Sequence, residues 1–401
     1  MSKTSRPLDG VRVLDIATYL AAPFCCTILG EFGAEVIKLE QPGVGDTLRS
    51  FGTQVDDSDT LVWLSEARNK KSATLDLRKP QGAAMLLELA RKSDMVVENF
   101  RPGTLDKWGV GYARLREVNP RIILVSISAY GQEGPYRMRP GFARIAHAFC
   151  GLTYLAGEPG RIPVVPGSTS LADYASGLWA ALGAMMALRA RDANGRGQHV
   201  DVALYESLFR MLDEMVPAYD RLGFVRERMG ADTVNVVPHS HYECRDGRWV
   251  AIACTNDKMF ARLAVAMKTP ELAAADRFGP IAARLAQRDE VNAIVSNWTG
   301  SLTSDEIQAI CDKEQVPCSL IYSVADICAD SQFKARGSIS HIEDPRVGRL
   351  AVPSPIPRLS ETPARIEGLG PTLGQHNDYV YRDLLGLSEQ QQRDLREGKI
   401  I

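Results

Sequence analysis

The sequence predicts an α/β protein with a large, doubly wound Rossmann-like domain and a smaller α+β domain. In the first half of the chain, apolar strand-like segments alternate with amphipathic helical segments, an order typical of a parallel sheet covered by helices on both faces. From His241 onward the pattern changes to an antiparallel hairpin followed by helices. The length of 401 residues also exceeds what one hydrophobic core usually holds, which favours two domains.

The first elements repeat a strand, helix, strand order. Strands are predicted at 11–15 and 35–40 with a helix over 23–32 between them, and Gly33 is expected to close that helix. Such a unit gives a parallel strand pair joined by a right-handed crossover. A polar turn at 69–72 then leads into a strand at 73–77. The order continues with a helix over 80–91, a strand at 94–98, a helix over 105–118 and a strand at 122–127.

The second half of the chain divides into a long helix, a hairpin region and a proline-rich tail. A helix over 168–191 rich in alanine and glycine, a strand at 198–202 and a helix over 206–215 complete the first block. A hairpin at 241–244 and 249–253 precedes helices over 257–267, 289–298 and 303–314. Prolines at 353, 355, 357 and 363 favour extended chain before a last helix over 378–385. The predicted domains are 1–224 (large), 225–330 (small) and 331–401, a return segment that completes the large domain.

Composition excludes several classes of function. The chain is 45% hydrophobic and 24% charged, and its 47 basic and 49 acidic residues form no long like-charge block, so neither a nucleic-acid nor a membrane partner is expected. No strongly apolar run reaches the ~18 residues that a membrane span needs. Residues 1–7 are polar and carry no secretory signal, which favours a cytoplasmic protein. The eight cysteines lack metal-ligand spacing, so we expect reduced, mostly buried thiols and no metal site.

Candidate ligand-binding residues follow the predicted strands. Asn99 and Phe100 come directly after the strand at 94–98, and the segment 128–131 with Tyr130 follows the next strand, both at the carboxyl edge where open α/β sheets bind ligands. The segment 69–72, with Lys70 and Lys71, is interpreted on its own as a solvated basic turn. Gly30 and Gly33 follow a helix rather than open one, which disfavours a dinucleotide loop.

Asp173 is predicted in the first turn of the long small-residue helix. A carboxylate there is either a partner of the helix dipole or a nucleophile. Backbone N–H groups and the dipole predict a low pKa for it. Small neighbours at Ala172, Ala175 and Gly177 leave room for an acyl group beside the carboxylate.

Taken together, ordered segments along nearly the whole chain resemble class III CoA-transferases, the family of formyl-CoA transferase and carnitine CoA-transferases. The overall pattern is most similar to the succinyl-CoA:dicarboxylate branch of that family. The segments are PLDGVRVLD (7–15), GAEVIKLE (33–40), NKKS (69–72), ENFRPG (98–103), GRGQ (195–198), ADI (325–327), ARG (335–337) and LLGL (384–387).

The resemblance implies an interlocked-ring homodimer in which each large domain is built from both chain ends. It implies that Asp173 is the nucleophile and that CoA thioesters are substrates, with no permanently bound cofactor. The residues that match positions contacting CoA are Ala21, Lys70, Lys71, Asn99, Phe100 and Lys107. The substrate pocket is expected to contain Leu20, Arg49, Tyr130, Arg144, His147, His239 and His241, some of which would bind a second carboxylate.

The departures from relatives bear on the substrate. Leu20, Gln41 and Ser128 stand where formyl-CoA transferase has glutamine, arginine and lysine, which disfavours oxalate. The resemblance therefore implies transfer of CoA, from succinyl-CoA in this branch, to a short dicarboxylate such as itaconate, glutarate, mesaconate, malate or citramalate, through an aspartyl-CoA thioester.

Two rival functions stay open. One is an isomerase acting at the α-carbon of an acyl-CoA with Asp173 and His147 as the acid–base pair, although Phe142 stands where the racemase branch has its histidine. The other is a non-catalytic CoA-binding subunit that supports a partner chain.

Overall fold

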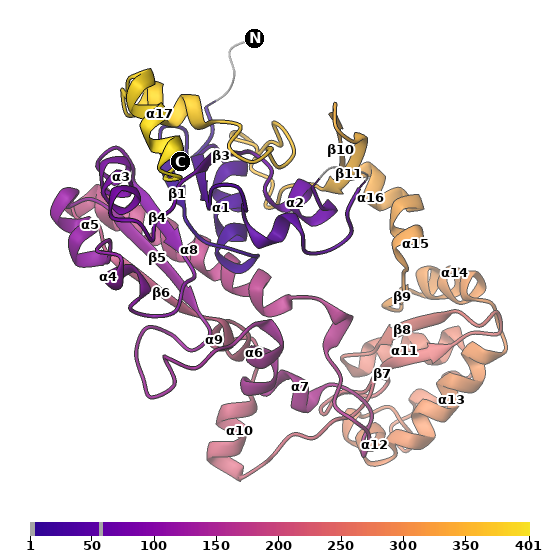
Figure 1. Cartoon of the computed structure of the whole chain (residues 1–401). Coiled ribbons are helices and arrows are strands. Elements are labelled where there is room, and N and C mark those ends of the chain that lie inside the picture. Colours follow the sequence, from indigo (N-terminus) through magenta and orange to yellow (C-terminus); the bar gives the residue numbers. More distant parts are fainter. Residues whose placement is uncertain (1–4, 56–58) are drawn as a thin grey trace. The chain divides into compact units, whose positions relative to one another are not determined.

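The computed structural model describes residues 5–55 and 59–401, so the first residues of the polar N-terminus lie outside the described chain (Figure 1). The chain forms two compact units. Unit 1 takes its residues from the chain up to 152, from 167–213 and from 334–401. Unit 2 consists of 153–166 and 214–333. Segments 153–166 and 214–224 thus belong to the smaller unit, whereas the sequence placed them with the large domain.

Unit 1 is built on a six-stranded parallel sheet with the order β3-β2-β1-β4-β5-β6. The strands are β1 (Arg12–Asp15), β2 (Glu35–Glu40), β3 (Lys70–Thr74), β4 (Met95–Glu98), β5 (Ile123–Ser128) and β6 (His199–Ala203). This order confirms the predicted doubly wound sheet. The strand order reverses between β1 and β4, and ligands of such sheets bind at the carboxyl ends of the strands at that point.

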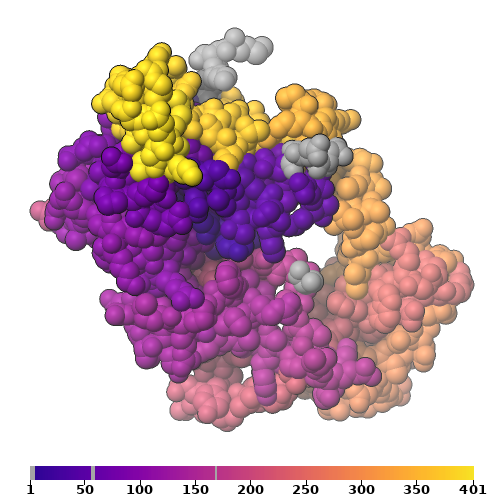
Figure 2. All heavy atoms as spheres, viewed as in Figure 1, coloured from indigo at the N-terminus to yellow at the C-terminus, as the bar shows by residue number. Residues whose placement is uncertain are grey.

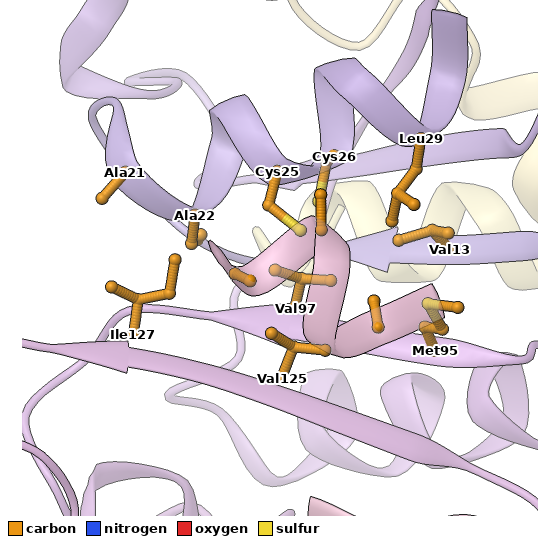
Figure 3. Packing of buried hydrophobic residues seen from close by; sticks show 14 of the residues in the cluster. Val13, Ala21, Ala22, Cys25, Cys26, Leu29, Met95, Val97, Val125 and Ile127 are labelled. Carbon is orange, nitrogen blue, oxygen red and sulfur yellow. The ribbon is translucent and has the colours of Figure 1, made fainter. Parts of the chain in front are cut away.

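Helices cover both faces of this sheet. On one face α1 (Ala21–Glu31) and α8 (Leu171–Asn194) pack on the buried side chains of β1, β4 and β5. Figure 3 shows Ala22, Cys25 and Leu29 of α1 directed toward Val13 and Val97 of the sheet. The other face carries α3 (Pro80–Arg91), α4 (Thr104–Lys107) and α5 (Tyr112–Val118). Shorter helices complete the unit: α2 (Leu61–Glu66), α6 (Ala143–Phe149) and α9 (Leu204–Phe209).

The close contact between α1 and α8 depends on small residues. A Cβ atom on Gly177 would lie 2.6 Å from the carbonyl oxygen of Ala21 and 2.9 Å from the ring of Phe24, so no larger residue fits there. Ala172, Ala180 and Ala184 of α8 are also fully buried. By length and hydropathy α8 could cross a membrane, and half of that apolar window is buried inside the protein.

The C-terminal segment lies against the N-terminal part of unit 1. Figure 2 shows the yellow C-terminal residues covering the indigo and purple ones. Thr74 of β3 donates its N–H to Asn377 at 2.8 Å, and the Asp76 N–H reaches the Ile400 carbonyl at 2.8 Å. This segment contains β10 (Ile339–Asp344), β11 (Gly348–Pro353), a π-helix (Tyr379–Leu384) and α17 (Glu389–Glu397).

Unit 2 is a small α+β body. Strands β7 (His239–Glu243), β8 (Trp249–Ala253) and β9 (Cys318–Leu320) form an antiparallel sheet, which confirms the predicted hairpin. Helices α11 (Asp257–Ala266), α13 (Arg288–Gly300) and α14 (Ser304–Glu314) pack on it around Phe260 and Val295. Further short helices are α7 (Leu152–Leu155), α10 (Met215–Leu222), α12 (Ile281–Ala286), α15 (Val324–Ala329) and α16 (Ser331–Ala335).

Several predicted boundaries were wrong. The third strand is Lys70–Thr74 rather than 73–77, because Lys70 finds a buried acidic partner and so stays in the sheet instead of a solvated turn. The helix predicted over 105–118 is two helices, interrupted at Gly109, whose φ is +75°. The helix predicted over 206–215 ends at Phe209, and the hairpin β10–β11 and helix α17 were missed.

Candidate active site

The switch point of the sheet is shaped by the loop 16–20, which runs from β1 into α1. The side chain of Asn99, directly after β4, spans this loop: its Oδ1 accepts the Thr18 N–H at 2.9 Å and its Nδ2 donates to the Thr18 carbonyl at 2.7 Å. The next residue, Tyr19, has a φ of +61° and donates its N–H to Asp46 at 3.0 Å. The backbone before α1 is therefore held from two sides.

A buried network of four charges lies beneath this loop. Lys70 Nζ lies 2.9 Å from Asp15 Oδ2, and Lys38 Nζ lies 2.7 Å from Asp46 Oδ2 and 3.4 Å from Asp15 Oδ1. All four side chains are at most 1% exposed. The two lysines also donate to the carbonyls of Ala17 and Pro23. Burial disfavours ionised Asp15, but the charges of Lys38 and Lys70 outweigh it and lower the pKa of that carboxyl.

This network changes the interpretation of Lys70. Its ammonium is paired inside the protein, so the surface-turn interpretation is wrong and its effect on a ligand is indirect. Lys71 points the other way, with its side chain 35% exposed, its Nζ 2.5 Å from Glu35 and 3.8 Å from the centre of the Tyr379 ring. Of the two lysines, Lys71 is the more accessible, although its ammonium is paired with Glu35.

Arg49 is likewise engaged inside the protein. Its guanidinium pairs with Glu40 at 2.7 Å and with Asp59 at 3.0 Å, and it stacks on Trp63 at 3.7 Å from the ring centre. Only 9% of its side chain is exposed. Two carboxylates already neutralise this cation, which weakens its expected role as the partner of a substrate carboxylate.

Asp173 lies in the first turn of α8, one turn before Gly177 on the same side of the helix. Because Gly177 meets the start of α1 at Ala21, Asp173 lies on the face of α8 that turns toward the switch-point loop. The neighbouring Tyr174 packs edge-on against Phe24 of α1, with ring centres 4.8 Å apart. Asp173 is therefore one helical turn from the point where α8 contacts Ala21, another residue predicted to be in the site.

The expected low pKa of Asp173 is wrong. Burial raises the pKa of this carboxyl to about 6, and a hydrogen bond from Ser170 offsets the effect only in part. Burial therefore outweighs the stabilisation that the first turn of a helix gives to an anion. The less stabilised anion is a better nucleophile once it forms.

His147 lies on α6 and is 1% exposed. Its Nε2 accepts the backbone N–H of Ala172 at 3.0 Å, so the ring is neutral with its proton on Nδ1. Burial and the charge of Arg144 lower the pKa of this imidazole. Because its Nε2 is occupied in this way, His147 is poorly placed to contact a substrate. The arrangement also argues against the isomerase function, which needs His147 as a proton donor and acceptor.

The other predicted residues occupy different places. Leu20 and Ala21 are buried at the start of α1, and Phe100 packs edge-on against Trp108 at 4.9 Å. Tyr130 lies in a cluster of aromatic rings that also contains Tyr136, Phe149 and Tyr205. Lys107 and Arg144 are exposed at the ends of short helices. His239 and His241 are on β7 of unit 2, so they belong to a different unit from Asp173.

The sequence interpretation missed Asp15, Lys38, Asp46 and Glu98. The available signal was a charged residue inside an otherwise apolar strand, as in VLD and VIKLE, because such a charge requires a buried partner. Within residues 5–55 and 59–401, no group of three or more His, Cys, Asp or Glu side chains is placed to hold a metal ion.

Comparisons with known proteins agree with this geometry. Residues 8–377 match the model of CoA-transferase family III. The chain is 52% identical over 98% of its length to the succinyl-CoA–L-malate CoA-transferase alpha subunit of Chloroflexus aurantiacus, covering 92% of that protein. It is 43% identical to the succinyl-CoA–D-citramalate CoA-transferase of the same organism, with 99% and 98% of the two chains covered.

A solved structure supports the fold. The crystal structure of a CAIB/BAIF family protein from Brucella suis superposes with a TM-score of 0.83 at 34% identity, covering 95% of this chain and all of that one. Sequence and fold therefore agree along nearly the whole chain, and the protein belongs to CoA-transferase family III.

Proposed function

We propose that this protein transfers CoA from succinyl-CoA to a short dicarboxylic acid, with Asp173 as the nucleophile. The observation that carries the proposal is Asp173 in the first turn of α8, one turn before the contact of Gly177 with Ala21, with a pKa raised to about 6 by burial. Among the acids named above, malate and citramalate are the leading acceptors, because the similar enzymes from Chloroflexus are named for them.

The proposed chemistry proceeds through three species on Asp173. The carboxylate attacks the thioester carbonyl of succinyl-CoA, giving a mixed anhydride and CoA thiolate. The thiolate then attacks the aspartyl carbonyl, which releases succinate and leaves an aspartyl-CoA thioester. The acceptor carboxylate attacks this thioester and the thiolate returns to the acceptor's carbonyl, so CoA leaves on the new acid and Asp173 is regenerated. Each step exchanges acyl bonds of comparable energy.

Residues around the switch point are proposed to bind the CoA and acyl parts. Asn99, Phe100, Lys71 and Lys107 are proposed CoA contacts, because the first two follow β4, Lys107 is exposed and Lys71 is half-buried rather than enclosed like Lys70. Lys70 acts on CoA indirectly, through the buried network. Leu20 and Tyr130 are proposed for the acyl pocket, and exposed Arg144 is the strongest candidate for the second carboxylate. Arg49 is a weaker candidate for that contact, while His147 is engaged with Ala172 and His239 and His241 belong to unit 2.

The test measures succinyl-CoA consumption with malate, citramalate, glutarate, itaconate and mesaconate, and with acetate and propionate as monoacids. We expect turnover with the diacids and none above background for Asp173→Asn, while Asp192→Asn, an exposed carboxylate on the same helix, keeps full activity. Treatment of the enzyme with succinyl-CoA and borohydride, followed by peptide mass spectrometry, should show reduction at Asp173. Equal turnover with monoacids, or an active Asp173→Asn, would remove the proposal.

We further propose that the active enzyme is an interlocked homodimer located in the cytoplasm. Exposed apolar side chains on α8, including Leu178, Leu182 and Met186, support a covering partner. A heteromer is the second candidate, because the relative at 52% identity is named an alpha subunit and one at 50% identity a beta subunit. Turnover by the purified single chain separates the two: an active homogeneous enzyme supports the homodimer.

A further inference from the structure

We infer that His147 is a positioning residue that fixes the first turn of α8, and with it Asp173, by accepting the backbone N–H of Ala172. The inference rests on the proposed function, because it takes Asp173 as the nucleophile. It assigns His147 a role in the transfer reaction that involves neither contact with substrate nor transfer of a proton.

The first turn of a helix has backbone N–H groups without partners inside the helix, and an N-cap side chain usually satisfies one of them. At α8 the N-cap residue is Ser170, whose side chain makes no cap hydrogen bond within the described chain. Its hydroxyl instead donates toward the Asp173 carboxylate, which lowers the pKa of that carboxyl. Ser170 therefore serves the nucleophile rather than the helix.

His147 takes over the capping role from a different helix. Its Nε2 lies 3.0 Å from the Ala172 nitrogen, and the ring is 1% exposed. Its neighbour Ala146 and the bonded Ala172 are both buried in the same hydrophobic cluster. A side chain held by packing has few alternative rotamers, so its bond to Ala172 fixes the backbone position next to the nucleophile.

The charge state of the ring fits this role. A protonated imidazole has no acceptor nitrogen and would place a positive charge at the positive end of the helix dipole. Burial and Arg144 both favour the neutral ring. The fold thus keeps His147 neutral, with Nε2 as an acceptor, although its Nδ1–H has no hydrogen-bond partner among the described residues.

The test compares His147→Gln, His147→Leu and His147→Asn in the full-length protein. The glutamine amide oxygen can reach the Ala172 N–H, whereas leucine offers no acceptor and asparagine is shorter. Displacing a reacting group by about 1 Å costs on the order of 100-fold, so we expect Leu and Asn to lower kcat by about 10- to 100-fold with KM for succinyl-CoA changed less than about twofold. Gln should keep kcat within about threefold of the parent enzyme.

Thermal unfolding of each variant separates positioning from loss of fold. If Leu does not fold, the Gln and Asn variants at matched stability still decide the question. The inference would be overturned if the Asn or Leu variant kept the kcat of the parent, or if only KM increased. It would also be overturned if the Gln and Asn variants lost kcat equally. The proposed function fails independently, because an active Asp173→Asn refutes the nucleophile whatever the His147 variants show.

Discussion

Asp173 is subject to two opposing influences, and their balance decides the pH range in which it can act. The helix start and the Ser170 hydroxyl favour the anion, while burial favours the protonated acid and dominates. The position in a helix first turn could be predicted from the sequence. The sign of the pKa shift could not, because burial depends on the tertiary surroundings of the carboxyl, which local sequence does not give.

The raised pKa of Asp173 predicts an acid limb in the rate profile. Below pH about 6 the carboxyl is protonated and cannot attack a thioester, so kcat/KM for succinyl-CoA should fall about tenfold per pH unit there and be level above it. Steady-state rates between pH 4.5 and 8 measure this limb. Ser170→Ala removes a bond to the anion and should move the limb to higher pH. A limb centred near pH 4 would contradict the burial argument.

Because Lys70 is paired inside the protein, its substitution is predicted to lower stability rather than simply to remove a ligand contact. Its removal leaves the buried carboxylate of Asp15 with Lys38 alone at 3.4 Å. Breaking a buried ion pair from one side costs about 3 to 5 kcal/mol, so Lys70→Met should lower the free energy of unfolding by about that amount. Urea denaturation measures the change.

The matched control is Lys71→Met, one residue along the same strand. Its pair with Glu35 is partly exposed, with side chains 35% and 24% accessible, so the loss should stay below about 1 kcal/mol. Because Lys71 is partly accessible and is a proposed CoA contact, its removal should instead raise KM for succinyl-CoA. The opposite pattern, with Lys70→Met stable and weak in CoA binding, would restore the predicted surface role.

At the scale of the elements, the end of β4 carries a second buried carboxyl. Glu98 is 4% exposed, and its Oε2 accepts the Phe100 N–H at 2.7 Å, which shapes the turn into the proposed CoA contacts. Burial raises the pKa of Glu98 to about 7, and hydrogen bonds from Ser126 and Phe100 offset this only in part. The turn is thus anchored by an acid that is partly protonated at neutral pH.

This anchor predicts a pH-dependent stability. The folded-state pKa lies above that of the unfolded chain, so the folded protein binds the proton more tightly and loses stability as pH rises from about 4.5 through 7. Glu98→Gln keeps an acceptor for the Phe100 N–H but cannot ionise. The free energy of unfolding of Glu98→Gln, minus that of the parent, should therefore rise by up to about 3 kcal/mol from pH 4.5 to pH 8. Urea denaturation of both proteins at both pH values measures this difference. A difference independent of pH would refute the raised pKa.

The elements differ in how far local sequence determines them. The helix over 80–91 was predicted with its observed bounds, because its apolar spacing and the proline at its start are local signals. Strand β3 was misplaced, because Lys70 is polar in sequence and buried only through Asp15, a residue 55 positions away. The hairpin β10–β11 was missed because, of the prolines that indicated extended chain, only Pro353 lies in it, and extended chain by itself indicates no pairing partner.

At the scale of the whole molecule, both chain ends contribute to unit 1, and β3 shows how. Its outer edge is held by the C-terminal segment through Asn377, while its inner side pairs with β2. The alternation of strands and helices predicts the sheet itself. That the C-terminal segment completes the edge of this sheet was predicted only from the family resemblance. Contacts between residues some 300 positions apart leave no periodic signal in the sequence.

The exposed face of α8 predicts the assembly state. Leu178 is 54% exposed, Leu182 43% and Met186 62%, and they recur every four residues, so they form one apolar stripe. A shallow, open surface patch formed by Met185, Met186, Arg189, Ala190 and Ala193 continues it. Contiguous apolar surface of this kind is costly in water and is typical of an interface. A second copy that covers the stripe would also support the helix that carries Asp173.

We therefore expect the purified protein to run in size-exclusion chromatography with light scattering at twice its 44.0 kDa chain mass. Leu182→Glu combined with Met186→Glu places two charges one turn apart in the stripe, so it should shift the protein to the single-chain mass and lower turnover at least tenfold, about the effect of losing 1.4 kcal/mol at the transition state. Arg393→Glu, a charge change on exposed α17, should alter neither. A single-chain mass for the unmodified protein with full activity would show that Asp173 needs no covering partner.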